Sequence, residues 1–287
     1  MDLDLNPASC GKRMMAMMER MAPFNGLINS VGLDHRIGMM EQELPGAVVH
    51  EYPAGQEIGS WIIPPQWRAT TGFMKDAAGK TIASIEECSL FVAPYSEPVD
   101  GRFSKKEIEQ HLRTASHQPD AFCLEHRNAY NFKLVDWAIT LPFSRWQSLP
   151  EEDKYHIKIE VATEEKPMKV FEFFLPGQRP NILNVAGHID ELCNDDLSGC
   201  VVGVELMRWL QQRPHRKYSY QLLLAPELIG TVAYVQSQSK TVERTFGMLN
   251  LETTGAGESW CLKQALNPDA YLFKTLVMAA RNRKLDF

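Results

Sequence analysis

Apolar residues at helical spacing open the chain and give way to short β-prone runs. Methionines at positions i, i+3, i+4 and i+7 within residues 11–22 predict a helix that packs its apolar stripe on a core. A second short helix is predicted for residues 33–42. Residues 47–100 contain short runs rich in β-branched and aromatic residues, separated by Pro and Gly turns. This pattern indicates a small, mostly β module.

The middle of the chain is predicted to contain one helix start and two strands. Ser104 and Glu107 have the spacing of a capping box, which predicts a helix that continues to about Arg113. Residues 155–161 and 168–175 carry the residue pattern of strands. The first run alternates like a half-exposed strand, and the second is predicted to be its hairpin partner, ending at Pro176 and Gly177.

From Asn181 onward the pattern predicts strands and helices in strict alternation. The expected elements are a strand at 181–187, a helix at 197–212, a strand at 218–225, a helix from 229 to 237, a strand at 246–251 and a helix at 268–283. This order predicts an α/β fold, with a mixed or parallel sheet between two helical layers. We expect residues 1–44 and 177–287 to form this domain, with residues 45–176 inserted as a β-rich module.

Composition narrows the class of protein. The 287 residues are 44% hydrophobic and 23% charged, with a net charge of −6, which is typical of a globular protein and argues against a nucleic-acid partner. No apolar run approaches about 18 residues and the first residues lack a signal-peptide pattern, so we expect no membrane partner. Six scattered cysteines without a C-x-x-C pair favour free thiols and a cytoplasmic location.

Candidate chemistry is concentrated where the first strand of the alternating region ends. Residues 188–196 supply one imidazole and four carboxylates, from His188, Asp190, Glu191, Asp195 and Asp196. Glu227 and Glu252 follow the next two strands. Because the carboxyl ends of parallel strands meet at one edge of a sheet, these side chains are expected to converge. Imidazole and carboxylate are the ligand types of zinc and related metals.

Each of these residues also has a structural explanation. His188 could be a buried core histidine, and Asp195 and Asp196 could cap the next helix, a position for which Ser198 competes. Glu227 lies at a predicted helix start, where an acid is favourable in any case, and Glu252 could be a surface acid. All four structural explanations would have to hold at the same time, so we prefer the hypothesis of a metal site. The other seven histidines show no ligand spacing, and no serine-hydrolase, P-loop or Rossmann motif is present.

Four motifs resemble a known family. They are Gly187-His-Ile-Asp190, Asn194-Asp-Asp-Leu-Ser-Gly199, Ala225-Pro-Glu-Leu-Ile-Gly230 and Leu249-Asn-Leu-Glu-Thr-Thr-Gly255. They are similar to motifs of the zinc-dependent aminopeptidases, and most closely to a bacterial branch of uncharacterised aminopeptidase-like proteins. The runs Trp61–Trp67 and Pro94–Arg102 resemble the inserted β module of that branch. The resemblance implies an aminopeptidase-like fold over most of the chain.

The resemblance also implies a role for each site residue. His188 would bind a metal, and Asp190 would orient its imidazole. Asp195 corresponds to a ligand that bridges two metals. Glu227 corresponds to the general base. Glu252 would bind the same metal as His188, at a position where Asp is more usual.

Two departures from the family concern the second metal. Leu228 stands where the aminopeptidases have a second metal-binding Glu, and no His follows His215 although the family supplies a late one. The chain ends at Phe287, soon after the third strand, so we expect a C-terminally short member. The remaining ligands fit one zinc ion with an open position, which is a catalytic arrangement. A second ion is not expected, and iron, manganese or cobalt could replace zinc.

The leading functional hypothesis is a metal-dependent hydrolase that acts on a peptide or another small amide. The alternative is a degenerate, non-catalytic binding or scaffold protein, with a link to polysaccharide biosynthesis implied by the resemblance alone. Leu228 and the missing late His favour the alternative, whereas four polar residues kept at one site favour the enzyme. The sequence leaves the substrate and any homo-oligomer open.

Overall fold

The computed structural model describes most of the chain. The described residues are 6–125, 131–151, 154–191, 194–255, 261–263, 267 and 269–284. The chain divides into two compact units. The first unit contains residues 1–24, 34–51 and 169–287, and the second contains residues 25–33 and 52–168. The domain limits expected from the sequence stay a prediction.

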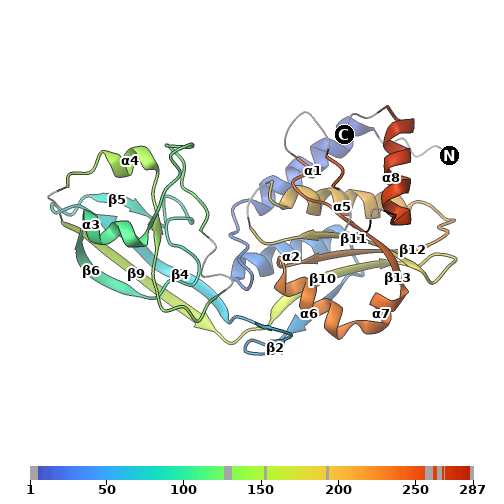
Figure 1. The fold of residues 1–287 in the computed structure, drawn as a ribbon, viewed down its shortest axis with the longest axis horizontal. Helices are drawn as coiled ribbons and strands as arrows, with labels where there is room; N and C mark the ends of the chain where they lie inside the picture. The colour runs from blue at the N-terminus through green and yellow to red at the C-terminus, as the bar shows by residue number, and fades with distance from the viewer. Residues whose placement is uncertain are drawn as a thin grey trace. The chain divides into compact units, whose positions relative to one another are not determined.

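The first unit is built on a five-stranded mixed sheet. Its strands, in spatial order, are β1 (Val48–Tyr52), β10 (Met168–Leu175), β12 (Ser219–Ala225), β11 (Ile182–His188) and β13 (Thr245–Asn250). Strand β11 is parallel to both β12 and β13, whereas β10 is antiparallel to β12. The nearly continuous apolar sequences of β11 and β12 suit strands that are covered on both faces. Figure 1 shows β10 to β13 running side by side.

Helices cover both faces of this sheet. They are α1 (Pro7–Met21), α2 (Val31–Glu43), α5 (Leu197–Gln211), α6 (Ile229–Ser237), α7 (Ser239–Arg244) and α8 (Tyr271–Asn282). Helix α5 packs closely on β12, since a Cβ atom at Gly203 would lie 2.6 Å from Leu222. Tyr234 of α6 accepts a hydrogen bond of 2.6 Å from Gln221, the neighbour of Leu222. Because side chains alternate along a strand, α5 and α6 lie on opposite faces.

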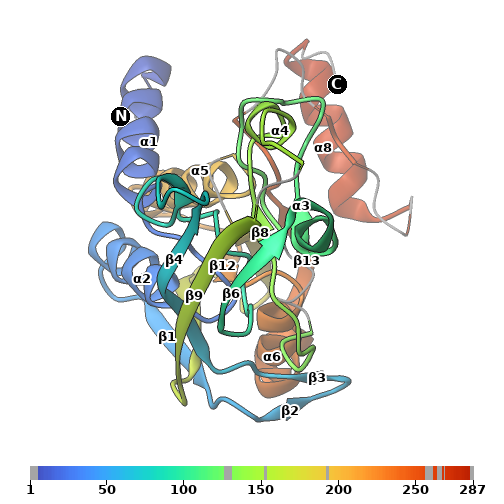
Figure 2. The same ribbon diagram turned by 90° about the vertical axis from the view of Figure 1, so that its left-hand side faces the viewer.

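The second unit contains a four-stranded antiparallel sheet. Its order is β5 (Thr81–Ser84), β4 (Gln66–Lys75), β9 (Lys154–Glu164) and β6 (Val99–Ser104). Figure 2 shows β4, β9 and β6 side by side. The shorter elements are β2 (Glu57–Ile58), β3 (Trp61–Ile62), α3 (Lys105–Ile108), the 3-10 helix η1 (Glu109–His111), β7 (Leu112–Arg113), β8 (Ile139–Thr140) and α4 (Phe143–Gln147).

Two local predictions are wrong. Strands β9 and β10 form no hairpin, because β9 pairs with β4 and β6 while β10 pairs with β12 in the other sheet. Alternation identifies a strand but carries no information about its partner. The capping box of Ser104 and Glu107 is present, but its helix ends at Ile108. The following residues instead form a 3-10 turn and then β7, which pairs with β8.

The remaining boundaries in the alternating region agree with the sequence to within a few residues. The spans of α5, α6, β11, β12 and β13 differ from the predicted ones by at most one residue at each end. The described cysteines are free thiols. Across the described part of the chain, no helix combines the length and apolar character needed to cross a bilayer.

Candidate metal centre

The site forms at the carboxyl ends of three neighbouring strands. β11 ends at His188, which is level with Ala225 at the end of β12. Two residues earlier on β11, Ala186 is level with Asn250 at the end of β13. The loops that leave these three strands therefore begin at one edge of the sheet, where α/β proteins commonly bind ligands.

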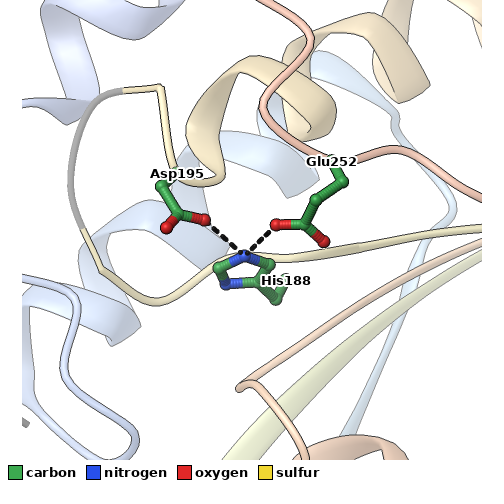
Figure 3. Close-up of side chains that lie close together, drawn as sticks. All are labelled: His188, Asp195 and Glu252. Carbon is green, nitrogen blue, oxygen red and sulfur yellow. Dashed lines mark hydrogen bonds and ion pairs between the residues drawn. The ribbon is translucent and has the colours of Figure 1, made fainter. Parts of the chain in front are cut away.

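His188, Asp195 and Glu252 meet at this edge. The Nε2 atom of His188 lies 3.1 Å from Asp195 Oδ1 and 3.2 Å from Glu252 Oε1. One ligand atom from each residue fits within a mutual distance of 4.8 Å. The His188 side chain is 11% exposed, whereas Asp195 is 56% and Glu252 49% exposed. Figure 3 shows the ring nitrogen of His188 between the two carboxylates. The exposure of Asp195 and Glu252 leaves the cluster accessible from solvent on their side.

Asp190 contacts the second ring nitrogen of His188. Its Oδ1 lies 3.2 Å from His188 Nδ1 and accepts a hydrogen bond of 2.8 Å from the backbone amide of Glu227. Asp190 is 2% exposed. With a proton on Nδ1 donated to Asp190, the lone pair of Nε2 faces Asp195 and Glu252. This is the orientation that an outer carboxylate gives to a metal-binding histidine.

Glu227 reaches the site through its backbone. It follows β12 and precedes α6, and its amide is the contact that anchors Asp190. Its role as a base stays a prediction. Leu228, the next residue, is 51% exposed.

Asp196 joins the loop of Asp195 to the loop of Glu252. It is fully buried, and its Oδ1 accepts hydrogen bonds from Gly199 N at 3.0 Å and Thr253 N at 2.9 Å. Asp196 is therefore the N-cap of α5, and Ser198 instead donates to the carbonyl of Asn194 at 2.7 Å. Asp196 thus caps the helix, while Asp195, the residue before it, lies beside His188. The peptide bond that joins Asp195 to Asp196 is cis.

Arg36 is a residue of the site that the sequence did not reveal. It is fully buried on α2, and its guanidinium donates to the carbonyls of Ile189 at 2.9 Å and Glu191 at 2.5 Å. Both carbonyls belong to the loop of Asp190. A signal was present in the sequence, since Arg36 lies in the apolar stripe that contains the buried residues Leu33 and Ile37. An arginine in such a stripe needs buried partners.

Each of the three loops turns through a non-glycine residue in the left-handed region. The φ angles are +66° at Glu191, +57° at Leu228 and +46° at Thr253, and each residue directly follows a candidate site residue. At Leu228 the Ile229 amide bonds back to the Glu227 carbonyl at 2.7 Å, which makes a γ-turn. Such conformations cost about 1–3 kcal/mol each and cluster at functional sites.

The electrostatics of the cluster favour a bound cation. Burial alone would lower the pKa of His188, but the hydrogen bond and charge of Asp190, followed by Asp196 and Glu252, raise it to about 10. Burial raises the pKa of Asp190, and burial raises the pKa of Asp196 to about 7. One imidazole thus faces an excess of carboxylates. Because a divalent ion can replace the proton at Nε2, the donor set of one nitrogen and two oxygens fits a metal.

Three other histidines lie outside this cluster. His50, His111 and His156 pair with single acids elsewhere in the chain. Among the described residues, His188, Asp195 and Glu252 form the one group of three or more His, Cys, Asp or Glu side chains that could hold a metal. His126 and Cys193 lie outside the described residues.

The fold resembles that of aminopeptidases. The chain is similar to the crystal structure of a "putative peptidase" from Clostridium acetobutylicum, with a TM-score of 0.80, 21% identity, and coverage of 88% of this chain and 59% of that one. It is also similar to BSAP, a zinc aminopeptidase from Bacillus subtilis, with a TM-score of 0.68, 13% identity, and coverage of 100% of this chain and 79% of that one. These likenesses concern the fold.

The chain belongs to the family described as Domain of unknown function (DUF4910), whose model matches residues 15–286. A protein from Clostridium acetobutylicum named "Putative polysaccharide biosynthesis protein with aminopeptidase-like domain" is 22% identical over 232 residues, which are 80% of this chain and 52% of that protein. The chain therefore spans about half the length of the curated relative that it matches. The family expected from the sequence motifs is confirmed.

Proposed function

We propose that the protein is a metal-dependent hydrolase of the aminopeptidase type, which acts on a peptide or another small amide. The observation that carries the proposal is the cluster in which His188 Nε2 faces Asp195 and Glu252 while Asp190 holds Nδ1. Three protein ligands that leave one side open to solvent are typical of catalytic zinc sites. The aminopeptidase fold supports the proposal, and zinc is the first metal to test.

The residues of the chain have distinct parts in this hypothesis. Asp190 keeps the imidazole in one orientation, and His188, Asp195 and Glu252 would hold the ion. When bound, the ion would supply Lewis acidity that polarises the carbonyl group of the substrate. Glu227 is proposed to accept the proton of the attacking water and to pass it to the leaving amine.

Hydrolysis of aminoacyl-p-nitroanilides and short peptides, with and without added Zn²⁺, tests the proposal. We expect turnover that a chelator abolishes. Glu227→Gln is expected to lower kcat by at least about 100-fold with metal affinity nearly unchanged, because general bases contribute about 10²–10⁴ in rate. Glu243→Gln, which changes an exposed acid of α7, is the matched control and should keep full activity. Equal activity of Glu227→Gln and wild type would contradict the assigned base.

A second candidate function is binding without catalysis, in a protein linked to polysaccharide biosynthesis. Its supports are the name of the Clostridium relative and the half-exposed Leu228, at a position where the resemblance implies a metal-binding Glu. A wild-type protein that binds one metal yet turns over no amide substrate would favour this candidate.

A further inference from the structure

Arg36 is a buried charge that the proposed chemistry does not use. Its side chain comes from α2, far from β11 in sequence, and is fully buried. Its Nη2 donates to the carbonyl of Phe24 at 2.5 Å, and its Nη1 donates to two carbonyls of the loop after β11. Arginine is rarely buried completely unless its donors are bound, so the carbonyls account for its position.

The two loop carbonyls lie on either side of Asp190. They belong to Ile189, at 2.9 Å, and Glu191, at 2.5 Å. One guanidinium nitrogen therefore fixes the residue before Asp190 and the residue after it. The carboxylate between them contacts His188 Nδ1 and the Glu227 amide.

The backbone of this loop requires such support. Glu191 has φ of +66°, a left-handed conformation that is unfavourable for a side chain with a Cβ atom. The hydrogen bond from Arg36 to the Glu191 carbonyl stabilises the peptide that follows this turn. Charge-assisted hydrogen bonds of this kind are stronger than neutral ones.

We propose that Arg36 is a positioning residue, which sets the direction of the Asp190 carboxylate and, through it, of His188 Nε2. The proposal rests on the proposed function, since the direction of Nε2 matters only for an ion held there. Outer partners of metal-binding histidines commonly change metal affinity by about 10- to 100-fold. Arg36 does not contact His188 in this proposal; it acts on Asp190 through the backbone carbonyls of Ile189 and Glu191.

The first test uses the metal-free full chain and follows amide hydrogen exchange at Glu227 by NMR. Arg36→Met removes every donor, and Arg36→Lys keeps one charge without the planar fork. Both are expected to lower protection of the Glu227 amide, by about tenfold or more for Met. Met40→Ala, which truncates another fully buried residue of α2, controls for general loss of packing and should leave that protection near wild type.

The second test measures Zn²⁺ affinity by competition with a chelator. We expect Arg36→Lys to weaken binding by about tenfold and Arg36→Met by up to about 100-fold. Low millimolar guanidinium chloride should partly restore binding in Arg36→Ala, and should not change Met40→Ala. If Arg36→Met does not fold, Arg36→Lys decides the question.

The outcomes separate this proposal from the proposed function. Unchanged Glu227 protection in the Arg36 variants, or an equal loss of zinc in Met40→Ala, would overturn the positioning role. A wild type that binds no zinc, but whose Glu227 protection depends on Arg36, would contradict the metal-dependent function and leave the positioning of Asp190 by Arg36 intact.

Discussion

The carboxylate of Asp196 connects two loops of the candidate site, so its removal should loosen both. Asp196→Ala deletes the acceptor for the Gly199 amide at 3.0 Å and for the Thr253 amide at 2.9 Å. Asp196→Asn keeps an acceptor oxygen at the same place and is the matched control. Asparagine is also a favourable N-cap, so the start of α5 should survive the conservative change.

The magnitude follows from the two lost hydrogen bonds. Loss of an N-cap costs about 1 kcal/mol, and a buried amide left without an acceptor costs about 1–3 kcal/mol. The Gly199 amide is buried, whereas the Thr253 amide lies in a more exposed loop and can turn to water. We therefore expect Asp196→Ala to lower the free energy of unfolding of this region by about 2 to 3 kcal/mol, and Asp196→Asn by less than about 1 kcal/mol.

Hydrogen exchange in the presence of a chelator measures this cost without a contribution from bound metal. Peptides from α5 should exchange about 30- to 150-fold faster in Asp196→Ala, because each 1.4 kcal/mol is a factor of ten. Peptides from β4 and β9, in the other unit, should be unchanged. A loss below 1 kcal/mol in Asp196→Ala, or an equal loss in Asp196→Asn, would refute the idea that this carboxylate joins the loops.

Two further predictions concern packing and pH. A Cβ atom at Gly199 would lie 2.3 Å from Asp196 Oδ2. Gly199→Ala should therefore lower the free energy of unfolding, measured by urea denaturation, by about 1–3 kcal/mol. Gly11 has open space around it, so Gly11→Ala should leave the free energy of unfolding unchanged or raise it. Burial alone would raise the pKa of Glu172, but hydrogen bonds, first from His50, hold it below its usual value of 4.5. The stability that ionised Glu172 contributes is therefore present above pH 4.5 and lost as pH falls through its lower folded pKa. The free energy of unfolding should therefore fall less steeply with acidification in Glu172→Gln than in wild type. An identical pH dependence in the two proteins would contradict the role of the Glu172–His50 pair.

Local sequence patterns predicted the α/β core because its elements are set by local periodicity. Apolar runs bounded by small or charged residues located α5, α6 and the three parallel strands to within a residue at each end. Pairing across long distances is not encoded in this way. Strands β9 and β10 were each recognisable, yet nothing in their alternation showed that they belong to different sheets.

The site was predictable to the extent that its residues follow strand ends. His188, Asp190, Asp195 and Glu252 come together because β11 is parallel to both β12 and β13. The supports of the site were not predictable in detail. The left-handed backbone at Glu191 and Thr253 is not marked by a glycine in the sequence. The two loop carbonyls that Arg36 binds, those of Ile189 and Glu191, lie more than 150 residues away along the chain.

Metal content per chain tests the central hypothesis most directly. Elemental analysis of protein purified without chelator, and again after dialysis against Zn²⁺, should find about one zinc in wild type and almost none in His188→Ala. His156→Ala, which alters a partly exposed histidine paired with Asp100, should keep the wild-type amount. Wild-type protein that takes up no metal, or His188→Ala that binds as much as wild type, would contradict the metal centre proposed here.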